Sequence, residues 1–248
     1  MTQRRILHLT GKDTMDFLQG LITNDVKKLA QAPIYAAILT PQGKYMADFF
    51  VAQDGDAVLL DVANDLGDML IQRLNMYKLR ANVAIATSDL HLHRGLGTPP
   101  KDGYADPRTP EMGWRAYRDT PQTDDTTDWD ALRVAHLIPE TGVELTPDTF
   151  ILEVGFERLN GVDFRKGCYV GQEVTARMKH KTELRKGLAQ VAIEGAAPVG
   201  TALMMNDKPA GTLLTQSGHH ALAYLRFDRA TGLMRADQAT ATWTPENQ

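Results

Sequence analysis

Three apolar runs of strand length follow one another between residues 34 and 62, separated only by turn sequences. The runs are IYAAILT, YMADFFVAQ and AVLLDV, and the connections are PQGK and DGD. Runs of this length bounded by Gly, Pro and Asp are typical of strands joined by tight turns. Short connections join antiparallel strands, because a parallel pair needs a crossover of a dozen or more residues. The chain therefore has to build an antiparallel sheet.

Helical patterns flank these strands. We expect a helix over about 13–21, with Thr10 and Asp13 resembling a capping box. A second helix is predicted after Asn64, where apolar residues recur at helical spacing. These are Leu66, Met69, Leu70, Leu74 and Tyr77. NVAIAT (82–87) reads as a further strand. Helices and antiparallel strands in this order predict an α+β fold.

The second half of the chain changes character twice. Five of the twelve prolines lie between Pro99 and Pro121, which predicts a loop-rich connection with one short strand, GWRAY. A disordered linker is the alternative. DWDALRVAHLI reads as a helix capped by Asp128, and the short strands after Gly187 predict a small β-barrel or sandwich. We therefore expect three parts, 1–94, 95–186 and 187–248.

Composition excludes several classes of protein. Cys168 is the single cysteine, so the chain has no internal disulfide and cannot hold an all-cysteine iron–sulfur cluster by itself. A net charge of −4 and a pI near 6.0 argue against a general nucleic-acid binder. No stretch approaches the ~20 apolar residues of a membrane span, and the N-terminus has no secretory signal. We expect a cytoplasmic protein without nucleic-acid or membrane partners.

Positive charge gathers around Cys168. Eight of the 27 basic residues fall in the 29 positions from Arg158 to Lys186. A solvated face and a site for an anionic ligand both fit this cluster. QEVTARMKH (172–180) is predicted to be a helix with a favourable Glu173–Arg177 pair. Cys168 precedes its N-terminus, which favours a reactive thiol if the side chain is exposed.

Other side chains raise specific chemical questions. No histidine lies in a recognisable cysteine-hydrolase context, and the pairs His91–His93 and His219–His220 lack a second ligand cluster for zinc. Glu153 and Asp48 each interrupt an apolar run. Each carboxylate either faces solvent or needs a partner or ligand, such as the paired N–H donors of a pterin. No phosphate-binding loop is present.

Several ordered segments resemble the YgfZ/GcvT-like, folate-binding family of iron–sulfur protein maturation. KGCYVGQE (166–173) resembles the family signature, and the resemblance covers most of residues 6–194. The other segments that carry it are FLQGLITNDV (17–26), LTPQGKYMADFFV (39–51), YKLRANV (77–83), DPRTPEMGWRAY (106–117) and residues 138–180. The resemblance implies the three-part fold of the glycine cleavage T-protein, an aminomethyltransferase, with antiparallel sheets and helices around a central channel and a small C-terminal β-barrel.

The resemblance also implies a ligand and a set of site residues. It implies that tetrahydrofolate is the cofactor, with no stably bound metal. Lys166 and Cys168 are the expected functional residues of the signature. The expected folate-binding residues are Glu153, Asn24, Asp48, Tyr169, Gln172, Glu173 and Arg177.

One position departs from the T-protein pattern. That enzyme has two adjacent aspartates where this chain has Ala47 and Asp48. This departure argues against aminomethyl transfer. The resemblance implies instead a tetrahydrofolate-binding accessory protein for assembly or repair of iron–sulfur clusters, supporting 4Fe–4S and radical-SAM enzymes. Its expected partners are iron–sulfur client enzymes or assembly factors. A folate-dependent aminomethyl or methyl transferase is the alternative.

Overall fold

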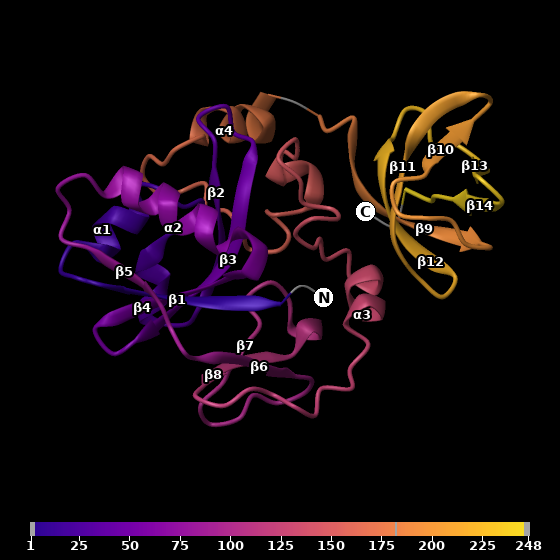
Figure 1. The fold of residues 1–248 in the computed structure, drawn as a ribbon. Helices are drawn as coiled ribbons and strands as arrows, with labels where there is room; N and C mark the ends of the chain where they lie inside the picture. Colours follow the sequence, from indigo (N-terminus) through magenta and orange to yellow (C-terminus); the bar gives the residue numbers. More distant parts are fainter. Residues whose placement is uncertain (1–2, 182, 246–248) are drawn as a thin grey trace. The chain divides into compact units, whose positions relative to one another are not determined.

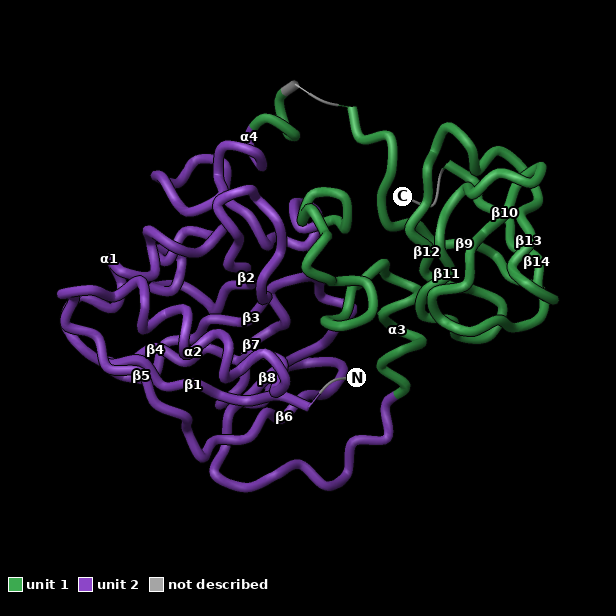
Figure 2. The backbone as a smooth tube through the Cα atoms, turned by 45° about the horizontal axis from the view of Figure 1, so that its top comes forward, with its two compact units in different colours: residues 1, 128–155, 177–248 green, residues 2–127, 156–176 purple. Residues whose placement is uncertain are grey.

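The computed structural model describes residues 3–181 and 183–245 of the chain. Its contacts group the chain into two compact units (Figure 2). Residues 2–127 and 156–176 form one, called here the N-terminal unit. Residues 128–155 and 177–248 belong to the other, called here the barrel unit. The predicted division at residues 94 and 186 is a different partition and stays a prediction.

The main sheet of the N-terminal unit has five antiparallel strands in the order β2-β3-β4-β1-β5 (Figure 1). Their bounds are β1 (Arg4–Thr10), β2 (Ile34–Leu39), β3 (Tyr45–Asp54), β4 (Ala57–Ala63) and β5 (Ala84–Thr87). The helices of this part are α1 (Thr14–Gln19), the 3-10 helix η1 (Val26–Ala30) and α2 (Asn64–Lys78). The antiparallel sheet predicted from the turn sequences is confirmed.

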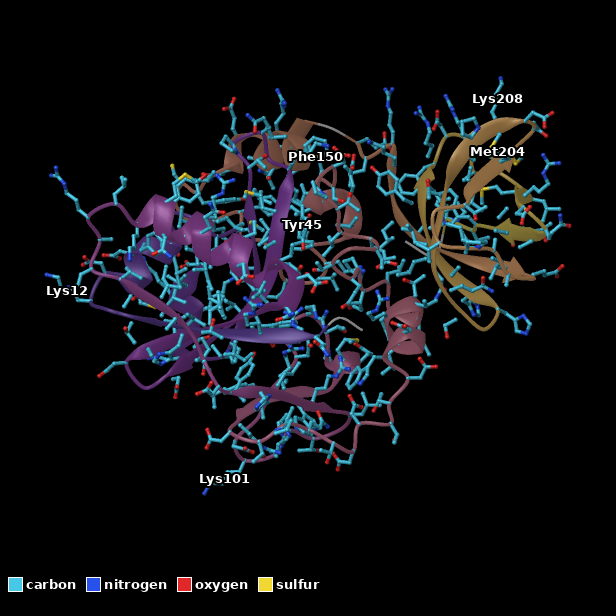
Figure 3. All side chains as sticks on the ribbon, in the orientation of Figure 1. Lys12, Tyr45, Lys101, Phe150, Met204 and Lys208 are labelled. Carbon is cyan, nitrogen blue, oxygen red and sulfur yellow. The ribbon has the colours of Figure 1, made fainter. Side chains whose placement is uncertain are left out.

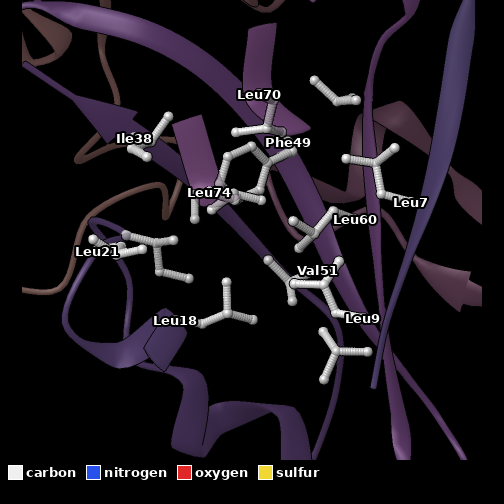
Figure 4. Close-up of a cluster of buried hydrophobic side chains, with 14 of the residues drawn as sticks. Leu7, Leu9, Leu18, Leu21, Ile38, Phe49, Val51, Leu60, Leu70 and Leu74 are labelled. Atoms are coloured by element: carbon white, nitrogen blue, oxygen red, sulfur yellow. The ribbon is translucent and has the colours of Figure 1, made fainter. Parts of the chain in front are cut away.

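One face of this sheet forms the main hydrophobic core. Strand side chains alternate between faces, so Phe49 and Val51 of β3 point to the same side. Leu70 and Leu74 of α2 pack there and are fully buried (Figure 4). These are two of the residues whose helical spacing predicted α2. Burial of this apolar stripe stabilises the helix against the sheet.

The opposite face carries buried charge. Asp61 of β4 accepts a 2.7 Å hydrogen bond from Arg4 and pairs with Arg115 of β8 (Trp114–Arg118). The Arg115 guanidinium lies 3.6 Å from the centre of the Phe50 ring. Burial opposes ionisation of Asp61, yet the two arginines hold its pKa below the ordinary value. These contacts attach the segment after residue 95 to the sheet.

Residues 95–127 are therefore ordered, and the disordered-linker alternative is wrong. They contribute to a three-stranded sheet in the order β6-β8-β7, with β6 (His91–Gly95), β7 (Tyr104–Ala105) and the 3-10 helix η2 (Pro110–Met112). The predicted strand GWRAY is β8. His93 of β6 is buried, and its Nε2 lies 2.6 Å from the carbonyl oxygen of Thr120. Within the described residues no group of three metal-ligating side chains forms a candidate metal site.

The barrel unit contains a closed barrel in the order β10-β11-β12-β9-β14-β13. Its strands are β9 (Lys186–Glu194), β10 (Ala202–Met205), β11 (Lys208–Ser217), β12 (His220–Arg226), β13 (Met234–Ala236) and β14 (Ala239–Thr242). This unit also contains α3 (Trp129–Ala135) and the 3-10 helix η3 (Ile151–Val154), whereas α4 (Gln172–Lys181) begins in the N-terminal unit and ends in the barrel unit. Asp128 caps α3 by accepting from the Ala131 amide, as predicted. The predicted barrel is confirmed.

One strand was not predicted, and one local prediction is wrong. The segment RRILHLT forms β1, a central strand that we did not predict, and Thr10 ends it. Thr10 therefore does not cap α1, and Asp13 precedes that helix without a side-chain capping bond. The Asp13 carboxylate accepts instead from the Asn82 amide at 2.7 Å. No helix in the described part of the chain is long and apolar enough to cross a membrane.

Candidate functional site

Lys166 of the signature is buried and binds the backbone of a distant turn. Its Nζ donates to the carbonyl oxygens of Gln19 at 2.7 Å, Ile22 at 2.6 Å and Asn24 at 3.1 Å. An ammonium has three donors, so these bonds use all of them. Burial lowers the pKa of Lys166 to about 8. Lys166 thus fastens the signature to the turn that follows α1.

Asn24 lies in the same turn, and both polar atoms of its side chain are hydrogen-bonded. Its Nδ2 donates to the carbonyl oxygens of Tyr35 at 2.8 Å and Asn160 at 2.7 Å. Its Oδ1 accepts from the Asp25 amide at 2.9 Å and from Lys28 at 3.0 Å. The side chain of this predicted ligand residue therefore connects β2 with the segment before the signature.

Cys168 lies two residues after Lys166 and is exposed. The next residue, Tyr169, is buried, which raises its pKa to about 12. The Lys166 Nζ lies 5.0 Å from the centre of the Tyr169 ring. Two buried side chains therefore hold a short exposed segment, Gly167 and Cys168, between them. The exposure on which the expected reactivity depends is present.

The signature continues into α4 through a close backbone contact. Gly171 has φ +84°, and a Cβ there would lie 2.6 Å from the Thr40 carbonyl oxygen. Gln172 starts the helix and its Oε1 accepts from the Tyr169 amide at 3.3 Å. Glu173 and Arg177 are exposed, and the ion pairs found among the described residues do not join them. The predicted Glu173–Arg177 pair is wrong, although the predicted helix is confirmed.

Asp48 is buried between two phenols of the N-terminal unit. Tyr35 donates to its Oδ2 at 2.9 Å and Tyr45 donates to its Oδ1 at 2.7 Å. Tyr45 stands at the start of β3 (Figure 3). Burial and the neighbouring carboxylate raise the pKa of Tyr35 well above its ordinary value. The partner required by this buried carboxylate is thus supplied by the protein.

Glu153 lies in the barrel unit, on η3. It is buried, and its Oε2 accepts a 2.5 Å hydrogen bond from Tyr224 of β12. The Lys186 Nζ of β9 lies 3.6 Å from Oε1. Burial, followed by the contact with Glu153, raises the pKa of the Tyr224 phenol. Sequence reasoning missed both partners, since each looks like an ordinary polar residue of a barrel strand.

The structure therefore groups the predicted residues into two sets. Those of the N-terminal unit are Asn24, Asp48, Lys166, Cys168, Tyr169, Gln172 and Glu173. Glu153 and Arg177 belong to the barrel unit. The basic residues of the predicted cluster also differ in their partners. Lys166 binds backbone carbonyl groups, whereas Lys186 lies beside the Glu153 carboxylate.

These contacts decide which side chains have capacity left for a folate. Asn24 has two donor and two acceptor contacts, and both oxygens of Asp48 accept from tyrosines. Glu153 accepts one hydrogen bond, and the 3.6 Å separation from Lys186 is longer than a hydrogen bond. A carboxylate has about four acceptor positions. Glu153 therefore fits an edge with paired N–H donors better than the other two residues do.

Comparison with known proteins identifies the fold and the barrel. The model of the CAF17 C-terminal β-barrel domain matches residues 185–247. The aminomethyltransferase T of the glycine cleavage system from Bartonella henselae superposes with a TM-score of 0.76. The match covers 98% of this chain and 83% of that chain, at 11% sequence identity. It confirms the predicted fold class.

Sequence relatives share one name. The mitochondrial iron–sulfur cluster assembly factor IBA57 homolog of Mycosarcoma maydis is 30% identical over 84% of this chain. Mouse mitochondrial IBA57 is 30% identical over 92% of the chain, and the human protein is 29% identical over 92%. The chain spans 60% of the fungal relative's length and 77% of the mouse and human proteins. It therefore belongs to the IBA57 family of iron–sulfur cluster assembly factors.

Proposed function

We propose that this protein is an accessory factor for assembly or repair of iron–sulfur clusters, supporting 4Fe–4S and radical-SAM enzymes. Its relatives are named as iron–sulfur cluster assembly factors. The observation that carries the proposal is the exposed thiol of Cys168 between two buried neighbours, Lys166 and Tyr169. A thiol presented in this way is accessible to a partner protein or to a cluster in transfer.

The test is rescue of cluster-enzyme activity in a strain that lacks the gene. Wild-type protein should restore the activity of a radical-SAM enzyme, whereas Cys168→Ala should not. Cys168→Ser separates thiol chemistry from the polarity of the position, and it should fail as well. Equal amounts of folded protein are checked by circular dichroism. Full rescue by Cys168→Ala would remove the thiol from the mechanism.

The proposal includes tetrahydrofolate as ligand, bound through Glu153. Support comes from the resemblance to folate-binding proteins and from the free acceptor capacity of that carboxylate. Tyr169, Gln172, Glu173 and Arg177 are proposed as further contacts. Asn24 and Asp48 would act through the backbone and tyrosines they hold. The test is a calorimetric titration of reduced folate, repeated with Glu153→Ala. No binding by the parent protein refutes this part.

Partners and location complete the proposal. The expected partners are iron–sulfur enzymes or other assembly factors, and the YgfZ branch of the family is the proposed assignment. The relatives are named as mitochondrial proteins, so they give no support to the cytoplasmic location predicted above. Turnover of aminomethyl or methyl donors with reduced folate would favour the one-carbon transferase alternative.

A further inference from the structure

The turn that ends α2 holds a leucine in a conformation that favours glycine. Leu79 has φ +46° and ψ −103°. The Ala81 amide donates to the Lys78 carbonyl oxygen at 2.7 Å, which closes the turn. These dihedral angles are near the first central position of a type II′ turn, about +60° and −120°, where glycine is the usual residue. A residue with a Cβ is strained there.

The strain at Leu79 is not offset by burial of its side chain. Leu79 is 87% exposed, whereas Leu70 and Leu74 of the same helix are fully buried in the core. An exposed leucine gains little hydrophobic stabilisation, and glycine or asparagine would fit the turn with less strain. Backbone strain that packing does not offset is found mainly at functional positions. The leucine therefore points to a partner that covers it.

A second apolar side chain and two arginines adjoin Leu79 in the sequence of the helix. Met76, which is 55% exposed, lies three positions before Leu79, and Arg73 lies three positions before Met76. Residues three apart are neighbours on the surface of a helix. Arg80 follows Leu79 and is exposed. Among the ion pairs of the described residues, none includes Arg73 or Arg80. These four residues are called here the Leu79 surface.

The charge of this part of the chain favours an acidic partner. Residues 69–88 contain no Asp or Glu but three basic residues, Arg73, Lys78 and Arg80, although the whole chain has a net charge of −4. Asp13 is an acid beside the turn, and its carboxylate already accepts from a backbone amide at 2.7 Å. Complementary charge steers association and suppresses partners of the same sign. Two copies of this chain would bring like charges together at the Leu79 surface.

The apolar part of the Leu79 surface is too small for a membrane. The apolar stripe of α2, with Leu70 and Leu74, is buried against the sheet, which leaves Met76 and Leu79 exposed. A helix that lies on a membrane instead buries a whole apolar face in the lipid. One or two exposed apolar groups beside arginines are the pattern of an anchor in a protein interface.

We propose that the Leu79 surface docks an acidic segment of a partner protein. Leu79 enters an apolar pocket of the partner, while Arg73 and Arg80 pair with its carboxylates. The closed turn holds Leu79 in place before the partner arrives, which lowers the entropic cost of binding. The surface includes none of the signature residues or proposed folate contacts, so this inference is independent of folate binding and of the Cys168 thiol.

The test selects displayed random peptides on wild-type protein, with an excess of the soluble Leu79→Asn variant as competitor. The enriched peptides should carry net negative charge and at least one large apolar residue. The dissociation constant of such a peptide, measured by fluorescence anisotropy, should rise about tenfold or more for Leu79→Asn. Arg80→Gln should weaken binding less and reduce its dependence on salt, since salt screens exposed charges.

Unfolding in urea separates docking from a structural role. Asparagine tolerates positive φ better than leucine, so Leu79→Asn should unfold at the same or a higher urea concentration than wild type. Leu96→Asn is the matched control, because Leu96 is a leucine of the same unit that is 50% exposed. It should bind the peptide as wild type does. Unfolding of Leu79→Asn at a clearly lower urea concentration would show that the leucine serves the fold and would overturn the proposal.

The other possible occupants are tested directly. Vesicles of phosphatidylserine and phosphatidylcholine are assayed by co-sedimentation, and self-association of the protein by analytical ultracentrifugation. Wild type and Leu79→Asn should behave alike in both assays. Binding to vesicles, or formation of a dimer, that is lost in Leu79→Asn would assign the surface to lipid or to a second copy and overturn the proposal. Failure to enrich acidic peptides, or equal binding of them by Leu79→Asn, would overturn it as well.

Discussion

Lys166→Met removes one buried ammonium from the signature and leaves its apolar stem in place. The three carbonyl groups of Gln19, Ile22 and Asn24 then lose their donor. A buried acceptor without a partner costs roughly 1–3 kcal/mol. At the lower value for each group, the free energy of unfolding should fall by about 3 kcal/mol. The Lys166 side chain therefore has a role in the stability of the fold, whatever its role in function.

The measurement is urea unfolding followed by circular dichroism, with hydrogen exchange of peptides from residues 17–26 as the local probe. Exchange should accelerate in that peptide, because Lys166 bonds to the backbone of three of its residues. Lys27→Met is the control, since Lys27 is exposed on η1, and it should change stability by less than ~0.5 kcal/mol. If Lys166→Met is as stable as Lys27→Met, the reasoning about the carbonyl groups is wrong.

The pH dependence of the same residue has a definite sign. Burial lowers the pKa of Lys166 to about 8, whereas the ordinary value is 10.5. Between these values the unfolded chain binds more protons than the folded protein, so stability from this group rises with pH. The stability of wild type relative to Lys166→Met should therefore increase from pH 8 toward 10.5. A difference that falls over this range would contradict the burial of the ammonium.

Three other predictions concern separate parts of the molecule. Gly171→Ala should be more destabilising than Gly142→Ala in urea unfolding, because both have φ near +84° but only Gly171 meets backbone within 3 Å; equal losses would contradict this. Asp61→Asn should lower the free energy of unfolding by about 3–5 kcal/mol at neutral pH. Below about pH 4 wild type should lose stability as the Asp61 carboxylate is protonated, whereas the variant has no such carboxylate and should lose less. Equal losses in both proteins as the pH falls would refute the ion-pair account. Cys168 should react with iodoacetamide in the folded protein about as fast as in urea, and strong protection would show that the thiol is covered.

The elements best predicted from the sequence are those whose apolar residues keep one spacing along their whole length. The strands β2, β3 and β4 and the buried stripe of α2 follow from alternation, turn residues and helical spacing. β1 was missed because it opens with two arginines, and Arg4 looks like a solvent-facing residue. In the structure Arg4 is paired with Asp61, a contact between positions 57 residues apart that no local pattern encodes.

The same limit applies to the site. The signature marked Lys166 and Cys168, but the partners of Lys166 are backbone carbonyl groups about 145 positions earlier, where side-chain identity carries no signal. Glu153 was marked as a carboxylate in an apolar run, with solvent exposure and a partner or ligand as the two alternatives, and its burial decides for a partner. The identity of that partner, Tyr224, depends on how the barrel strands pass η3. The residue type can thus indicate that a side chain needs a hydrogen-bond partner, but only the fold shows which residue is that partner.

The chain passes between its two units three times, at residues 127, 155 and 176. Residues 128–155 leave the N-terminal unit before it is complete and pack with strands made much later, as when Arg133 and Glu144 bond to Thr215. The signature segment then returns to close the first unit through Lys166. During synthesis, the N-terminal unit is complete only once residue 176 has emerged. At that point Arg133 and Glu144 still lack their partner Thr215, because β11 has not yet been made. A fragment limited to the matched barrel, 185–247, would therefore lack residues 128–155, which belong to the same unit.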